Sequence, residues 1–377
     1  MEKNKKETYS FIKYLSLYYW HEAKRFFSTG NAGSNLMMTQ KELNEARASK
    51  EIKDYDNICY RKGGVEGCLN LLNEDSILKP SDNPILDDDI KYLIDNVAGY
   101  KENNIDYLHR AILYKYHNIN DVHVPCIVFA GKGGSGKGTF ISLLGTIFGE
   151  ENVMCNLGQR ELTSSFDAYK GMKLVVEYAE VTSNNTQGDK KILNKLKNII
   201  GASKIIVNEK GVAQYEIENL AWFFISSNSN KPLQLDDRDK GNRRFSIILS
   251  EHKLENGKRI NKSVRVKEKV ENYLSWLYQT YPDILEYSEL EALENQDKFD
   301  LEQRSQEEAN SFWDFIEERY PNFKGKKTLA EVNELMTMYC IENSVDEREF
   351  LRFFWHNSKF SKKKIRIGEK TYMGVEI

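Results

Sequence analysis

The sequence predicts an α/β fold in which a buried parallel sheet is preceded and followed by helical segments. Three apolar runs, at residues 125–130, 173–178 and 220–225, have the continuous hydrophobic character of strands that are buried on both faces. The first run leads straight into a glycine-rich loop, and a helical apolar pattern follows that loop. Strand, loop and helix in this order are the context that a phosphate-binding loop requires.

The composition predicts a globular, cytoplasmic protein. With 377 residues and 40% hydrophobic content, the chain can bury a large core and divide into two or three domains. The five cysteines form no C-x-x-C pair, which favours a reduced compartment without structural zinc. No apolar run approaches the roughly 18 residues of a membrane span, and the charged start does not resemble a signal peptide. The net charge of −3 means that a nucleic-acid partner must meet a local basic surface or a channel lined by several subunits.

The glycine-rich loop has the spacing G-x-x-x-x-G-K, in which backbone N–H groups converge on phosphate oxygens and the lysine adds a positive charge. One position departs from the usual form, because a glycine follows the lysine and the hydroxyl residue comes one position later. Thr139 is therefore our candidate for the hydroxyl on the magnesium side. The predicted nucleotide-binding residues are Gly131, Lys132, Gly133, Gly134, Ser135, Gly136, Lys137, Gly138 and Thr139.

The helix after the loop is predicted from Phe140, Leu143, Leu144 and Ile147, which recur at helical spacing before Gly149. Its N-terminus would face the bound anion.

The second apolar strand ends in acid. A carboxylate beside the phosphate loop could bind magnesium or orient an attacking water. Glu180 is our first choice and Glu177 the alternative. Because Ala179 stands before Glu180 in place of an aspartate, the water-orienting role is the better supported of the two.

Polar residues also follow the third strand. Asn228 is placed to hydrogen-bond a γ-phosphate or the attacking water. Arg243 and Arg244 come just before a further apolar strand at 245–249, and Arg238 lies shortly before them. An arginine from a neighbouring subunit can stabilise charge on a transferring phosphoryl group. The alternative is that these arginines form salt bridges with the nearby aspartates at 236, 237 and 239.

A helix at 189–201 and a hairpin are predicted between the second and third strands. The hairpin strands, 205–207 and 215–217, flank a polar turn that contains Lys210 and Gly211. Taken alone, a lysine in a turn is most often a solvated surface residue.

The remaining chain is mostly helical by pattern. Residues 8–27 are rich in aromatic side chains and could form a core helix or a base-stacking surface, and residues 86–118 predict two helices. Residues 286–308 are acid-rich and predict a solvated helix or connector. Three helices (312–320, 329–342 and 345–354), with capping boxes at Thr328 and Ser344, precede a basic hairpin. This order is typical of a winged helix that contacts DNA through Lys363, Lys364 and Arg366, although a small packing domain with a basic edge is a close alternative.

The order and spacing of the loop, Glu180, the Lys210 hairpin, Asn228 and the arginine pair resemble the superfamily 3 helicases, most closely the poxvirus- and phage-type primase-helicases. The resemblance covers about residues 85–250 and implies an AAA+ P-loop NTPase core. It implies that Lys137 and Glu180 bind and hydrolyse Mg²⁺–ATP, that Asn228 senses the γ-phosphate, and that Arg243 or Arg244 reaches the next subunit. It also implies that Lys210 holds the DNA backbone in a central channel.

This resemblance divides the chain into five parts. They are an N-terminal region of unknown role (1–84), a helical, collar-like segment (85–120), the AAA+ core (121–252), a helical connector (253–308) and a winged-helix-like domain (309–377).

The resulting expectation is an ATP-driven DNA helicase that forms a ring. We expect a hexamer that acts on single-stranded or forked DNA during replication of a phage, plasmid or other mobile element. A primase or polymerase would be a separate partner, since the stretch before residue 85 carries no matching acidic constellation. The alternatives are a small-molecule kinase, because the loop also resembles that of adenylate kinase, and a non-helicase ATPase switch of the same fold.

Overall fold

The fold was analysed in a computed structural model of the chain. The structure describes residues 57–163 (apart from 67 and 122), 173–181, 187–207, 215–229 and 240–302. Before residue 57 it describes 17–20, 25–28 and 53–55, and between 229 and 240 only 232, 233 and 235. In the C-terminal part it describes 312–343 with gaps, 363–367 and 370–376.

A five-stranded sheet forms the centre of the molecule, and all of its pairings are parallel. Its order is β12-β6-β11-β8-β7. The strands are β6 (Cys126–Ala130), β7 (Val153–Leu157), β8 (Val175–Ala179), β11 (Trp222–Ser226) and β12 (Phe245–Leu249). The predicted mixed α/β fold with a parallel sheet is confirmed, and the four apolar runs are its inner strands and β12. The edge strand β7 was not predicted, because it is only half-buried and carries no continuous apolar run.

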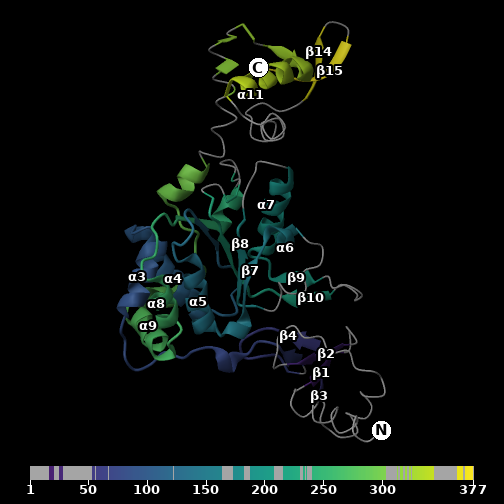
Figure 1. Ribbon diagram of the computed structural model, residues 1–377. Helices are drawn as coiled ribbons and strands as arrows, with labels where there is room; N and C mark the ends of the chain where they lie inside the picture. Colours follow the sequence, from purple (N-terminus) through teal and green to yellow (C-terminus); the bar gives the residue numbers. More distant parts are fainter. Residues whose placement is uncertain are drawn as a thin grey trace, which may run out of the picture.

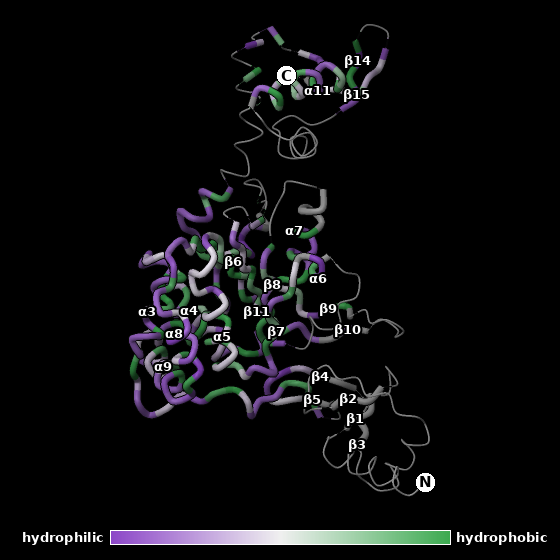
Figure 2. The backbone as a smooth tube through the Cα atoms, in the orientation of Figure 1, coloured by the Kyte–Doolittle hydropathy of each residue, from purple (hydrophilic) through white to green (hydrophobic). Residues whose placement is uncertain are grey.

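Helices cover both faces of this sheet (Figure 1). Alternate residues of each strand point to opposite faces, so Ile127 and Phe129 of β6 join one core and Cys126 and Val128 join the other. The first core includes residues of α3 (Asp88–Val97), α4 (Glu102–His117), α5 (Lys137–Phe148), α8 (Gly257–Ser263) and α9 (Lys267–Thr280). The second includes α6 (Gln159–Thr163) and α7 (Gln187–Ile199). In Figure 2 the hydrophobic colour is concentrated between these helix layers.

The helices predicted before and after the loop are confirmed. In α3 the predicted apolar face (Ile90, Leu93, Ile94 and Val97) is fully buried, and Asp87 caps the helix by accepting a hydrogen bond from the N–H of Asp89 at 3.0 Å. In α5 the four predicted apolar residues are fully buried, and Gly149 ends the helix with a φ of 84°. Short 3-10 turns connect the larger elements: η1 (Glu74–Ser76), η2 (Glu150–Asn152), η4 (Lys240–Arg244) and η5 (Pro282–Glu286).

Residues 57–82 pack into the same core as the sheet. The strands β4 (Asn57–Cys59) and β5 (Cys68–Asn70) pair in parallel, and Tyr60, Leu72 and Leu78 belong to the first core. The Tyr60 hydroxyl donates to Asn152 Oδ1 at 3.2 Å, and the N–H of Leu78 donates to the carbonyl of Ile147 at 2.9 Å. The proposed division at residue 84 therefore does not separate two hydrophobic cores.

The aromatic segment near the N-terminus contains strands where a helix was one of two expectations. Strand β1 (Leu17–Trp20) pairs antiparallel with β2 (Arg25–Ser28) and parallel with β3 (Lys53–Tyr55). The helix prediction is wrong for these residues. Runs of adjacent aromatic residues suit a pleated strand better than they suit a helix.

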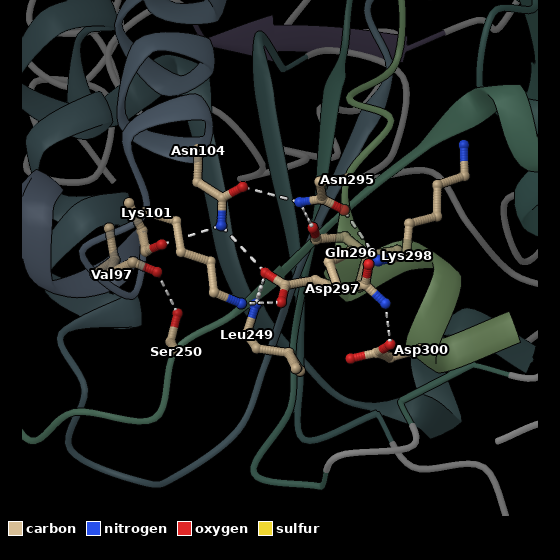
Figure 3. A network of polar contacts seen from close by, with 12 residues as sticks. Val97, Lys101, Asn104, Leu249, Ser250, Asn295, Gln296, Asp297, Lys298 and Asp300 are labelled. Carbon is tan, nitrogen blue, oxygen red and sulfur yellow. Dashed lines mark hydrogen bonds and ion pairs between the residues drawn. The ribbon is translucent and has the colours of Figure 1, made fainter. Parts of the chain in front are cut away.

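The acid-rich connector is not fully solvated, contrary to prediction. Asp297 is 1% exposed and accepts hydrogen bonds from the Nδ2 of Asn104 at 3.1 Å and the N–H of Leu249 at 3.1 Å, and it forms an ion pair with Lys101 (Figure 3). Asn295 donates to Asn104 Oδ1 and to the carbonyl of Ile247, at 2.8 and 2.9 Å. This segment therefore joins α4 to the end of β12, and a count of its acids could not reveal which one is buried.

The C-terminal part has a core of its own. A three-stranded sheet of order β13-β15-β14 contains β13 (Lys326–Thr328), β14 (Lys363–Ile367) and β15 (Lys370–Glu376), and α11 (Leu329–Asn343) packs with it. The predicted hairpin is confirmed as an antiparallel pair. The capping box is confirmed too, because the N–H of Thr328 donates to Glu331 at 2.7 Å and the N–H of Glu331 donates to Thr328 at 3.3 Å. Strand β13 was not predicted, and the helix at 345–354 with its cap at Ser344 lies outside the described residues.

Candidate nucleotide site

The loop of residues 131–139 joins the end of β6 to α5. Gly131, Gly134 and Gly136 have φ values of 117°, 80° and 94°, which favour glycine. A Cβ on Gly131 would lie 2.6 Å from the carbonyl oxygen of Ser250, and one on Gly136 would lie 3.0 Å from Cδ1 of Leu93. The positive φ values and these close approaches explain why glycine stands at these positions of the loop.

Lys137 lies inside the curve of this loop. Its ammonium donates to the carbonyls of Lys132 and Gly131, at 2.8 and 3.3 Å, and to Ser135 Oγ at 3.3 Å. Burial lowers the pKa of Lys137, while the nearby carboxylates of Glu180 and Glu177 oppose that effect. The amine is thus placed among the loop carbonyls with two acids close by.

Glu180 and Asn228 form the wall opposite the loop. Glu180 directly follows β8 and has a left-handed backbone with a φ of 53°. The Nδ2 of Asn228 donates to Glu180 Oε1 at 2.8 Å, and a Cβ on Gly133 would lie 3.4 Å from Asn228 Oδ1. Because β11 lies between β6 and β8, Asn228 stands between the loop and Glu180. The predicted loop, acid and amide therefore come together.

Glu177 lies deeper than Glu180 and has different partners. It is 3% exposed, and its two oxygens accept hydrogen bonds from Ser226 Oγ at 2.6 Å and from the N–H of Asn156 at 3.3 Å. It therefore links the ends of β7, β8 and β11. Ser226 and Asn156 were not predicted as site residues. The polar end of the third apolar run could have indicated Ser226, whereas nothing around Asn156 distinguishes it from a surface residue.

These residues line a cavity of about 470 Å³. It is formed by loop residues 133–139 together with Asn156, Glu177, Ala179, Glu180, Ser226 and Asn228, and by Leu254, Gly257 and Asn261 from the segment after β12. The last three were not predicted, because they lie outside the strand ends that the sequence marks.

The oxygen-bearing side chains of this cavity suit magnesium. Thr139, Glu177 and Glu180 all line it. Among the described residues no group of three or more acids, histidines or cysteines is placed to hold a metal by itself. The set of Thr139, Glu177 and Glu180 fits Mg²⁺, which usually binds one or two protein oxygens together with substrate phosphates and water.

Arg243 and Arg244 lie at the opposite edge of the sheet from the loop. They end η4, and the next residue, Phe245, pairs with Cys126 at the start of β6. The five residues of β6 separate the two edges by about 16 Å at a rise of about 3.3 Å per residue. Both arginines line a second cavity of about 460 Å³ with His123, Glu289 and Glu291. Within one chain, these arginines do not join the loop cavity.

The predicted DNA-contact residues fall in two places. The hairpin is confirmed as antiparallel strands β9 (Lys204–Val207) and β10 (Tyr215–Glu218), but Lys210 and Gly211 lie outside the described residues, as does Arg238. In the C-terminal part, Lys363, Lys364 and Arg366 are exposed on β14.

Comparison with known proteins adds family and fold relationships. Residues 129–244 match a family of unknown function (DUF5906). A stretch of 184 residues, 48% of this chain, is 31% identical to the DNA primase-polymerase of Nitratiruptor phage NrS-1. The match spans 24% of that protein, so the aligned stretch corresponds to about a quarter of its relative's length.

Solved structures of an NrS-1 C-terminal region share the fold. The apo structure of residues 305–718 gives a TM-score of 0.60 at 16% identity, with 96% of this chain and 95% of that chain covered. Its A form gives 0.58 at 16% identity, with 98% and 97% covered.

In the part of our chain that is described, no helix is both long and apolar enough to cross a membrane.

Proposed function

We propose that this protein is an ATP-driven DNA helicase of the superfamily 3, AAA+ type, which works as a ring, with six subunits as the expected number, in the replication of a phage or another mobile element. The observation that carries the proposal is the meeting of the Lys137 loop, Asn228 and Glu180 around one cavity, with Asn228 hydrogen-bonded to Glu180. A phosphate cradle, an amide and a carboxylate are the groups that nucleoside triphosphate hydrolysis needs in one place.

Each residue has a distinct part in this chemistry. The loop N–H groups and the Lys137 ammonium bind the β- and γ-phosphates, and the Thr139 hydroxyl faces the metal. Magnesium, when bound with the nucleotide, neutralises phosphate charge. Glu180 orients the attacking water and accepts its proton. Asn228, which lies between the loop and Glu180, holds that water or a γ-phosphate oxygen in line.

The position of the arginine pair favours an assembly over a lone subunit. Arg243 and Arg244 lie at the edge of the sheet away from their own loop, so in this proposal one of them completes the site of a neighbouring subunit. The aspartates of the salt-bridge alternative, at 236, 237 and 239, lie outside the described residues.

The relatives support a role in phage DNA replication. The name of the Nitratiruptor phage relative assigns it to primer and DNA synthesis, and the two solved structures compared above are of an NrS-1 C-terminal region. In our proposal, Lys210 and Gly211 contact the DNA backbone from the β9–β10 hairpin, and Lys363, Lys364 and Arg366 add a second, sequence-independent contact. A primase or polymerase activity acts beside this motor.

The test is ATPase activity with and without single-stranded DNA, measured beside the mass of the assembly. We expect DNA-stimulated hydrolysis by an oligomer and its loss in Lys137→Ala. Mixtures of Arg244→Ala and Glu180→Gln subunits should regain part of the activity if the site is shared between neighbours. A monomer that phosphorylates a small molecule, or a Lys137→Ala variant with full DNA-stimulated ATPase, would contradict the proposal.

A further inference from the structure

Two consecutive carbonyls of the phosphate loop accept hydrogen bonds from segments outside the loop. The carbonyl of Gly134 accepts a hydrogen bond from the N–H of Leu254 at 2.9 Å. The next carbonyl, that of Ser135, accepts one from the Nδ2 of Asn96 at 2.8 Å. The two donors come from the segment after β12 and from α3, neither of which belongs to the loop.

These two bonds also orient the N–H groups that follow. A trans peptide unit is planar, with its C=O and N–H pointing in opposite directions. When the carbonyls of Gly134 and Ser135 point toward Leu254 and Asn96, the N–H groups of Ser135 and Gly136 must point the other way. Both residues line the cavity, where N–H groups that point away from Leu254 and Asn96 can meet a bound phosphate.

Asn96 is itself fixed on every side. It is fully buried, and its Nδ2 donates a second hydrogen bond to the carbonyl of His252 at 3.0 Å. Its Oδ1 accepts from the Tyr100 hydroxyl at 3.1 Å. The same helix places Leu93 and Val97 next to the loop, 3.0 and 3.4 Å from where a Cβ on Gly136 would lie. Asn96 thus ties together α3, the loop and the segment after β12.

We propose that Asn96 is a positioning residue that sets the phosphate-binding amides before the nucleotide arrives. This role rests on the proposed nucleotide site and deepens it, because it identifies what shapes the loop from behind. An amide that is already turned toward the phosphate loses no free energy in reorientation when binding occurs. Without Asn96, the Ser135–Gly136 peptide is free to rotate, and the N–H of Gly136 no longer faces the anion.

The test compares Asn96→Ala with Asn104→Ala. Asn104 is a second buried asparagine, 1% exposed on α4, and it hydrogen-bonds to the carbonyl of Ala98 and to Asp297 but not to the loop. Dissociation constants for Mg²⁺–ATP, ADP and AMP are measured at a temperature where melting curves show each variant to be folded. We expect Asn96→Ala to bind ATP and ADP about 10- to 100-fold more weakly than the parent, as for a lost hydrogen bond to a charged group. The loss of affinity for AMP should be much smaller. Asn104→Ala should have a lower melting temperature than the parent but the same dissociation constants for all three nucleotides.

Asn96→Asp sharpens the comparison, because it keeps the shape of the side chain and replaces the donor by a second acceptor. It should weaken ATP binding at least as much as Asn96→Ala does. The positioning role is overturned if Asn96→Ala binds ATP within twofold of the parent, or if AMP is lost by the same factor as ATP. Lys137→Ala separates the two levels of the argument. If it weakens ATP binding and Asn96→Ala does not, only the positioning role is lost, whereas a parent chain that binds no ATP refutes the proposed function and this inference together.

Discussion

The close approach of the loop to the strand beside it makes Gly131→Ala the most informative single substitution. Gly131 follows β6, and its φ of 117° is a backbone conformation that alanine avoids. The nearest atoms to an added Cβ are the carbonyl oxygen, the carbonyl carbon and the nitrogen of Ser250, at 2.6, 3.0 and 3.3 Å. All three belong to the backbone, so the clash cannot be relieved by the movement of a side chain.

The expected cost has two parts. Holding alanine in this conformation costs about 1–3 kcal/mol. Moving the backbone of Ser250 to an ordinary contact distance costs about a further 1–3 kcal/mol, as in other overpacked sites. Ser250 cannot shift alone, because its N–H donates to the carbonyl of Ala130 at 2.7 Å and its Oγ donates to the carbonyl of Val97 at 2.5 Å. We therefore expect Gly131→Ala to lower the free energy of unfolding by about 2–6 kcal/mol.

Gly138→Ala is the matched control within the same loop. A Cβ at Gly138 would meet no atom within 4 Å, and the residue lies in the first turn of α5. Replacing glycine by alanine in a helix stabilises it by up to about 1 kcal/mol. Urea denaturation, followed by tryptophan fluorescence, should therefore give a lower midpoint for Gly131→Ala and an equal or higher one for Gly138→Ala. Equal midpoints for the two variants would refute the assigned approach of Ser250 to the loop.

Three other predictions concern buried polar groups and the metal. Burial lowers the pKa of His109 from 6.5 to about 3. At pH values between these two, the unfolded chain therefore binds a proton at His109 that the folded chain does not bind. The free energy of unfolding should fall as the pH decreases from about 6.5, by up to about 1.36 kcal/mol per pH unit, and urea titrations at several pH values should give a shallower slope for His109→Phe. Asp297→Ala leaves the N–H of Leu249 buried without its acceptor and should cost about 1–3 kcal/mol in the same assay, whereas Asp300→Ala, which loses only a contact with Gln296, should cost less than about 1 kcal/mol. Gly138→Thr restores a hydroxyl at the usual position after the lysine, so it should lower the Mg²⁺ concentration needed for half-maximal ATP binding and make Thr139→Ala tolerable; an unchanged Mg²⁺ titration would mean that the metal does not approach residue 138.

The parts of the fold that local pattern determines were predictable. The inner strands are buried on both faces and therefore show unbroken apolar runs, and α3, α4 and α5 each bury one stripe with helical spacing. Glu180 and Asn228 were found because they come one and two residues after such strands, and the carboxyl ends of parallel strands lie at one edge of a sheet.

The residues that were missed act through tertiary contacts between distant segments. Asn96 is an asparagine near the end of an amphipathic helix, and its sequence neighbours do not indicate that it touches Ser135, 39 positions away. Asp297 lies among many acids, and only the fold selects it for burial against Leu249. The arginine pair illustrates a third limit. The sequence places the pair just before β12, but it does not show at which edge of the sheet the arginines act.

The burial of Asp297 has a consequence for how the protein can be divided. A fragment cut at the expected core boundaries, residues 121–252, would contain the whole loop and all five strands of the sheet. It would nevertheless lack the acceptor for Leu249 and helices α3, α4, α8 and α9, which share a core with Ile127 and Phe129. It would also lack the Asn96 donor to the loop. A span from about residue 57 to residue 302 retains all of these contacts, so the candidate nucleotide site depends on that longer span and not on the motif-bearing segment alone.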